Sequence, residues 1–175
     1  MPEKTAKPTL EVTACELLGR GEALDILLDL DSFLKENNLK ASTTSVSYKV
    51  WVVIYKGKRI CRLKLMKENY WIFSLLIYKS FTDTPEYMSY VNDEQKEFLL
   101  AHFRPRTPCK NCKGSGKIEF LGNEYETYCG CYPIYTNSDN LRESPGLPER
   151  FKELALVSKN ILDGIATAKK IGKSK

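Results

Sequence analysis

The chain has 175 residues, of which 42% are hydrophobic and 28% charged, a composition that indicates an ordinary globular domain and excludes a disordered or fibrous chain. Its formal charge of +5 is mildly basic and falls short of the excess typical of a dedicated nucleic-acid binder. The apolar runs at residues 70–73 and 75–78 are far too short to span a bilayer.

The N-terminal stretch MPEKTAKPTLEV contains no apolar segment that could serve as a signal-peptide core, so we expect an intracellular, cytoplasmic protein. In a reducing cytosol, clustered cysteines favour metal binding or redox chemistry over structural disulfides. The prolines and charges of residues 1–9 predict a flexible end.

The first periodic pattern predicts a helix over residues 23–37. Apolar side chains recur at helical spacing from Leu24 to Leu34, which gives the helix one apolar face. The residues expected to point towards water are Glu22, Asp25, Asp29, Asp31 and Lys35.

Three strands are predicted next. Residues 45–55 are β-branched and aromatic, residues 58–65 alternate in polarity, and residues 70–78 are apolar on both faces, as in a central strand. Lys56–Gly57 forms a short turn between the first two, so we expect an antiparallel meander. The alternating segment places Cys61, Leu63 and Leu65 on one face and Arg62 and Lys64 on the other.

The second half of the chain predicts two helices and a hairpin. Asn92 and Gln95 have the spacing of a capping box, which predicts a helix over residues 93–103. The segment GKIEFLGNEYETY predicts a hairpin around Gly122–Asn123. Residues 138–148 indicate a polar, turn-rich link, and the apolar stripe that follows predicts a last helix over 148–168.

Together these patterns predict a single α+β domain over residues 10–170. An antiparallel meander sheet is packed by the three helices, and residues 106–135 form a cysteine-rich hairpin inserted in the domain. Residues 1–9 and 169–175 are expected to be flexible ends.

The cysteine-rich segment predicts a structural zinc site like that of a zinc ribbon. Two pairs with metal-ligand spacing are separated by the length of a short hairpin, and zinc prefers four thiolates in tetrahedral arrangement. The expected ligands are Cys109, Cys112, Cys129 and Cys131. Four protein ligands leave no open coordination position, so such a zinc would not be catalytic.

Other interpretations of the cysteines remain open. They are also consistent with free thiols, since cysteine is often a small buried hydrophobe, or with a redox dithiol. Gly114–Ser115–Gly116 argues against the helix N-terminus that a redox pair would use to lower a thiol pKa. The sole histidine, His102, is better explained as a partly buried residue than as a ligand replacing Cys131.

The segment CKNCKGSGK resembles one unit of the cysteine-rich zinc region of bacterial J-protein co-chaperones, whose signature is C-x-x-C-x-G-x-G. The match comprises Cys109, Cys112, Gly114 and Gly116, and the resemblance implies zinc binding. That family carries four such units and a His-Pro-Asp tripeptide, whereas this chain has one unit and no such tripeptide. The resemblance therefore does not extend to co-chaperone activity.

Residues 20–105 are similar in their order of elements to small uncharacterised bacterial proteins of the YdhG-like type, some of which are labelled iron chaperones. The aromatic strand, the Tyr55–Lys58 turn and the lysine-bounded next strand carry this resemblance. It implies a small bacterial α+β protein and identifies no catalytic residue.

Basic residues suggest a nucleic-acid interface, in two blocks without acids: Lys58, Arg59, Arg62 and Lys64, then Lys113 and Lys117. Tyr48, Trp51, Tyr55 and Tyr70 on neighbouring strands could stack bases beside them. The favoured interpretation is that the basic side chains protect the solvent face of a sheet from aggregation.

No paired carboxylates, catalytic triad or phosphate-binding glycine loop is evident, so we favour a non-enzymatic binding or interaction module with a structural zinc. Its partner is an unidentified protein or ligand. The alternatives are a nucleic-acid-binding protein using the basic sheet face, and a small-molecule-binding protein or enzyme with a pocket between sheet and helices.

Overall fold

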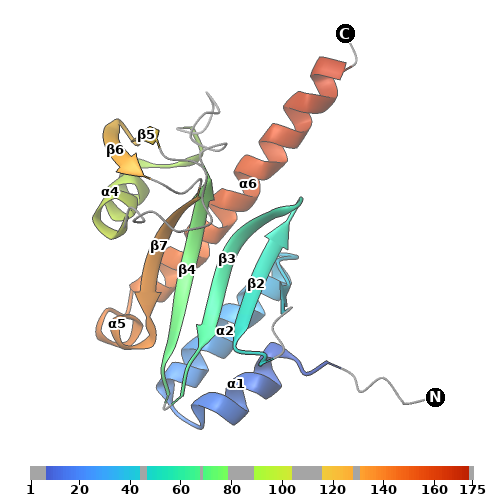
Figure 1. The fold of residues 1–175 in the computed structure, drawn as a ribbon, viewed down its shortest axis with the longest axis vertical. Helices are drawn as coiled ribbons and strands as arrows, with labels where there is room; N and C mark the ends of the chain where they lie inside the picture. Colours follow the sequence, from blue (N-terminus) through green and yellow to red (C-terminus); the bar gives the residue numbers. More distant parts are fainter. Residues whose placement is uncertain are drawn as a thin grey trace, which may run out of the picture.

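The computed structural model describes residues 7–43, 47–67, 69–78, 89–103, 116–127 and 131–173. Helices cover one face of a five-stranded antiparallel sheet with strand order β1-β2-β3-β4-β7 (Figure 1). The strands are β1 (Ala41–Ser42), β2 (Val50–Tyr55), β3 (Lys58–Leu65), β4 (Trp71–Tyr78) and β7 (Cys131–Asn137). The predicted α+β class is confirmed.

Two of the three predicted helices lie within one residue of their predicted bounds, and the third is longer. The helices are α1 (Leu10–Leu18), α2 (Glu22–Glu36), α4 (Asp93–His102), α5 (Ser138–Glu143) and α6 (Leu147–Lys173). The capping box of α4 is present, with Asn92 and Gln95 each bonding the other's backbone N–H. α6 continues past residue 168, where the apolar pattern stops.

Two short helices were not predicted. The hydroxyl of Thr9 accepts a hydrogen bond from the backbone N–H of Val12 at 3.2 Å, which caps α1. The side-chain oxygen of Asn137 accepts one from the N–H of Asn140 at 2.9 Å, which caps α5. Residues 138–143 are therefore helical, which corrects the expected turn-rich link.

The meander β2–β3–β4 forms as predicted, although β2 begins at Val50 and not at residue 45. The turn between β2 and β3 has positive φ at both central residues, 46° at Lys56 and 77° at Gly57, which suits the right-handed twist of the strands. β7 then pairs with β4 from Cys131 opposite Tyr78 to Asn137 opposite Ile72. This fourth long strand was not predicted.

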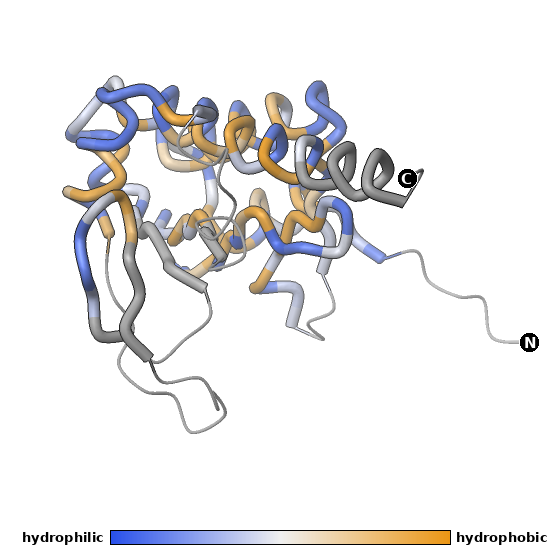
Figure 2. Tube along the Cα trace, turned by 90° about the horizontal axis from the view of Figure 1, so that it is seen from above, coloured by the Kyte–Doolittle hydropathy of each residue, from blue (hydrophilic) through white to orange (hydrophobic). Residues whose placement is uncertain are grey.

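The core lies between the sheet and the helices. Figure 2 shows the two layers from above, and in Figure 1 the strands lie in front of α2 and α6. Alternate strand residues face the helices and are buried, among them Trp51, Val53, Cys61, Leu63, Leu65, Trp71, Phe73 and Leu75. α2 contributes Leu27, Leu30 and Leu34 to the same core.

Asp31 corrects one prediction about α2. It was expected to face water, but it is only 2% exposed. Because Asp31 follows Leu27 by four residues and precedes Leu34 by three, it lies on the core-facing stripe of the helix. Its carboxylate forms an ion pair with Lys35 at 2.6 Å.

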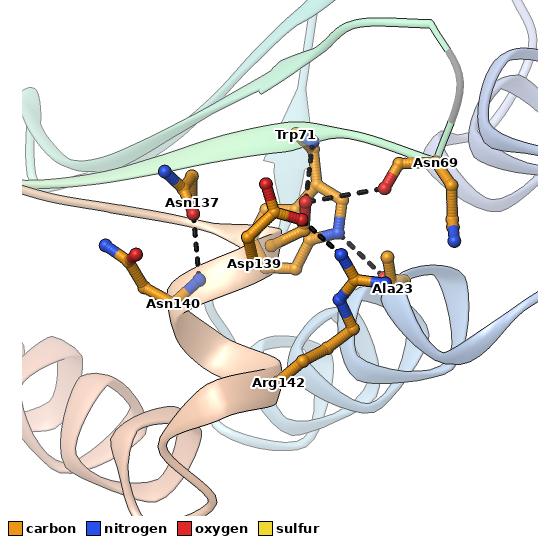
Figure 3. Close-up of polar contacts among 8 residues, drawn as sticks. Ala23, Asn69, Trp71, Asn137, Asp139, Asn140 and Arg142 are labelled. Carbon is orange, nitrogen blue, oxygen red and sulfur yellow. Dashed lines mark hydrogen bonds and ion pairs between the residues drawn. The ribbon is translucent and has the colours of Figure 1, made fainter.

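Trp71 joins the sheet to α2 and α5 (Figure 3). Its indole N–H donates to the carbonyl of Ala23 at 2.7 Å, and its backbone N–H donates to the hydroxyl of Ser138 at 3.3 Å. That hydroxyl in turn donates to the carbonyl of Asn69 at 3.4 Å. The first residue of β4 is thereby fixed to the start of two helices.

The predicted hairpin is confirmed, but as a separate two-stranded sheet of β5 (Gly116–Phe120) and β6 (Asn123–Thr127). Its turn has φ of 51° at Leu121 and 80° at Gly122.

α4 contacts the main core through Phe98. The centroid of the Phe98 ring lies 5.7 Å from that of Phe151 in α6, and the Phe151 centroid lies 4.9 Å from that of Phe73 in β4.

Candidate functional site

The face of the main sheet that the described helices leave uncovered (Figure 1) carries a row of basic side chains on β3. Residues paired directly across two antiparallel strands point to the same face. The partners of Arg59, Arg62 and Lys64 on β2 are, in that order, Ile54, Val52 and Val50. The buried residues Cys61 and Leu63 point the opposite way, towards the helices. We call Arg59, Arg62, Lys64 and these three aliphatic partners the basic sheet face.

A β-bulge decides which basic residues belong to this face. The register between β2 and β3 shifts between Val53 and Ile54, which leaves Ile60 as an extra residue on β3, fully buried. The shift places Arg59 on the same face as Arg62, although they are three positions apart in the sequence. Lys58 pairs with Tyr55 instead, on the side towards α6.

Several side chains of the basic sheet face are accessible to solvent. Arg59 and Lys64 are exposed, and Ile54 is 50% exposed, an unusual value for an aliphatic strand residue. Arg62 is half-buried, and its Nε has no hydrogen-bond partner among the described residues. A buried donor without a partner is uncommon in proteins and calls for a physical explanation.

The main sheet and the first two helices, α1 and α2, differ in charge. Within the bounds of its five strands, the main sheet contains no Asp or Glu, so the basic residues of β3 have no acidic neighbour in the sheet. α1 and α2 hold seven acids and one base: Glu11, Glu16, Glu22, Asp25, Asp29, Asp31, Glu36 and Lys35. The acidic part of the helix layer is thus α1 and α2, because α6 holds six basic residues and three acids.

Two of the four aromatic residues proposed to stack bases, Trp51 and Tyr55, do not share the basic sheet face. Trp51 is 4% exposed, and its indole N–H donates to the carbonyl of Tyr48 at 2.7 Å. The hydroxyl of Tyr55 donates to the Oδ1 of Asp163 in α6 at 2.8 Å. Both side chains are therefore engaged on the helix side of the sheet.

Asp163 lies at the centre of a cluster of polar side chains that was not predicted from the sequence. Lys56 forms an ion pair with its carboxylate at 2.6 Å, and Lys159 approaches at 3.5 Å. The hydrogen bond from Lys56 lowers the pKa of Asp163, helped by the bond from Tyr55, while partial desolvation acts the other way. The cluster ties the β2–β3 turn to α6. The residues lie 107 positions apart in sequence, so no local pattern signals it.

Most of the predicted metal ligands lie outside the described residues. This applies to Cys109, Cys112 and Cys129, and also to Lys113 of the second basic block. Cys131 begins β7, and Lys117 lies in β5. Among the described residues, no group of three or more His, Cys, Asp or Glu side chains could hold a metal ion.

The hairpin register nevertheless bears on the cysteine pairs. Gly116 pairs with Thr127, so the chain enters and leaves the hairpin at the same end. Cys112 precedes Gly116 by four residues, and Cys129 follows Thr127 by two. Along the sequence, the two cysteine pairs therefore flank the same end of the hairpin.

His102 has local partners that explain it. Its Nδ1 lies 2.9 Å from the carbonyl oxygen of Phe98, one turn earlier in α4. The imidazole also stacks on the Phe98 ring, with centroids 4.0 Å apart. These contacts agree with the prediction that His102 is a partly buried residue.

Comparisons with known proteins return no relative: no protein-family model, curated protein or solved structure matches the chain. None of the described helices is long and apolar enough to cross a membrane.

Proposed function

We propose that this protein is a non-enzymatic interaction module that binds an acidic protein partner on its basic sheet face. The observation that carries the proposal is the convergence of Arg59, Arg62 and Lys64 on one face that the described helices leave uncovered, in a sheet whose strands contain no Asp or Glu. Such a face attracts and orients an acidic surface through complementary charge.

The neighbours of the basic residues favour a protein over a nucleic acid. Each cation lies beside an aliphatic side chain of β2, and Ile54 presents half of its surface to solvent. Protein interfaces combine arginine with apolar contact area, whereas single-stranded nucleic acids need aromatic platforms for their bases. Trp51 and Tyr55, the aromatic candidates on β2, lie on the helix side.

A structural zinc bound by Cys109, Cys112, Cys129 and Cys131 remains part of the proposal. It is supported by the spacing of the cysteines and by their positions in the sequence, where the two pairs flank the paired ends of β5 and β6. The ion would hold residues 104–131 in place between α4 and β7 and leave no site for substrate.

A nucleic-acid duplex is the second candidate, because three cations without intervening acids also suit a phosphate backbone. Binding of that kind would weaken steeply between about 50 and 200 mM salt.

Fluorescence anisotropy with a labelled glutamate-rich peptide and a labelled short DNA duplex tests the proposal. The triple variant Arg59→Gln/Arg62→Gln/Lys64→Gln should bind the peptide roughly ten- to a hundredfold more weakly. The matched control Lys7→Gln/Arg20→Gln/Arg142→Gln removes the same charge from exposed positions outside the sheet and should bind normally. Tight binding to DNA alone, lost in the first variant, would establish the second candidate instead.

A further inference from the structure

We infer that the acidic partner is a second copy of this chain, whose α1 surface docks on the basic sheet face. The inference rests on the proposed function and adds the identity of the partner.

The outward surface of α1 has the opposite charge to the sheet. Glu11, Val12, Cys15 and Glu16 are all exposed, and the helix contains no Lys or Arg. Residues four apart lie on the same face of a helix, so Val12 and Glu16 are neighbours, as are Glu11 and Cys15. Two carboxylates therefore flank one aliphatic side chain and one thiol.

The two surfaces match in their apolar residues as well. Among the described residues, the large hydrophobic side chains that are exposed are Val12, at 47%, and Ile54, at 50%. Val12 lies beside the acids of α1, and Ile54 lies opposite Arg59 on the sheet. Docking would cover both aliphatic side chains while it pairs charges of opposite sign.

Arg62 supplies a third reason. A guanidinium is planar and takes a carboxylate through two parallel N–H···O bonds. Arg62 is half-buried, with a buried Nε that lacks a partner among the described residues. A carboxylate from α1 of the second copy would balance the charge of this guanidinium, although the Nε itself is closed to solvent.

The two surfaces differ, so the contact is heterologous: each copy offers its sheet to one neighbour and its α1 to another. α1 packs on α2, in the helix layer, so one copy presents both surfaces at once. Contacts of this type build open chains of copies when the rotation between them does not close a ring. We expect association that grows with protein concentration and weakens with salt.

Sedimentation velocity over a range of concentrations at low salt measures this association. The unaltered chain should form species larger than the monomer, and Arg59→Glu or Glu16→Arg should each keep it monomeric. The combined variant Arg59→Glu/Glu16→Arg exchanges the charges and should associate again. Arg142→Glu makes the same charge change as Arg59→Glu on exposed α5 and should behave as the unaltered chain.

A disulfide experiment locates the contact. Ile54→Cys should form an intermolecular disulfide with the native Cys15, seen as a larger band on a non-reducing gel, and Cys15→Ser in the same chain should remove that band. A monomer at every concentration at low salt would overturn the inference. If that monomer still bound the glutamate-rich peptide through Arg59, Arg62 and Lys64, the proposed function would stand with another acidic protein as partner. If the monomer also failed to bind the peptide, both the inference and the proposed function would be overturned.

Discussion

The ring of Phe103 stacks on the ring of Phe120, with centroids 4.7 Å apart and planes 26° apart. Phe103 follows the last residue of α4, and Phe120 ends β5. Tyr125 of β6 meets Phe103 edge-on at 4.8 Å, and Phe120 is fully buried. The hairpin thus has an aromatic anchor on α4, in addition to any metal that its cysteine neighbours bind.

Replacing Phe120 with alanine should release this anchor. Truncation of a buried phenylalanine typically costs about 3–5 kcal/mol, because it leaves a cavity as well as removing apolar contact. Amide hydrogen exchange should show lost protection across β5 and β6 with β2–β4 largely unaffected. Asn123→Ala, at an exposed position of the same hairpin, is the control and should retain protection. Equal exchange in both variants would show that Phe120 does not hold the hairpin.

Purified protein, prepared without added metal, should contain about one zinc per chain if four thiolates converge. Cys109→Ser and Cys131→Ser should each lose the metal, whereas Cys15→Ser should keep it. Because Phe103, Phe120 and Tyr125 anchor the hairpin separately, a chelator should leave the near-ultraviolet circular dichroism of the buried aromatic residues largely intact. Metal-free protein whose thiols all react at once would contradict the zinc proposal.

Gly164→Ala should destabilise the protein although alanine is the better helix former by about 1 kcal/mol. A Cβ at this position would lie 2.1 Å from the Tyr90 hydroxyl oxygen and 3.1 Å from its ring carbon. The tyrosine would have to move, at a cost of about 1–3 kcal/mol. Urea unfolding of the single variant and of Gly164→Ala/Tyr90→Phe checks this, since loss of the hydroxyl should restore most of the stability. Unchanged stability in Gly164→Ala would be inconsistent with the observed packing.

Cys61 should make the protein less stable in alkali. Burial raises the pKa of its thiol far above the usual value. In the unfolded chain the thiol loses its proton near pH 8.5, while the folded chain keeps it, so the folded state binds more protons above that pH. The stabilisation is therefore complete below about pH 8.5 and is lost as the pH rises, by about 1.4 kcal/mol at pH ~9.5.

The measurement is the free energy of unfolding in urea at neutral and alkaline pH for the unaltered chain and Cys61→Val. The other titratable groups are the same in both proteins, so their contributions cancel when the two pH dependences are compared. The unaltered chain should lose more stability than the variant, and an equal loss would show that Cys61 ionises in the folded state.

The local patterns predicted the meander and two of the three long helices closely. KRICRLKL alternates, Lys56–Gly57 allows positive φ, and the capping box marks the start of α4. β7 escaped prediction because its partner β4 is more than fifty residues away and because Pro133 interrupts its pattern. β7 is an edge strand of the sheet. Proline is tolerated in an edge strand, because the backbone on its outer side has no neighbouring strand to which an N–H must donate.

The candidate site was predicted only in part. Alternation placed Arg62 and Lys64 together correctly, but the bulge at Ile60 changes the alternation before Cys61. Arg59 therefore joins the basic sheet face and Lys58 does not, which a regular pattern cannot reveal. VWVVIY is apolar throughout, so its pattern alone does not reveal that Ile54 faces solvent.

The central claim is that the basic sheet face is the binding surface, and NMR mapping of the glutamate-rich peptide tests it most directly. Titration at low salt should shift the backbone amides of residues 50–54 and 59–64, with little change in α6 or α4. Shifts confined to the helix layer or the β5–β6 hairpin, or no shifts at all, would contradict the claim.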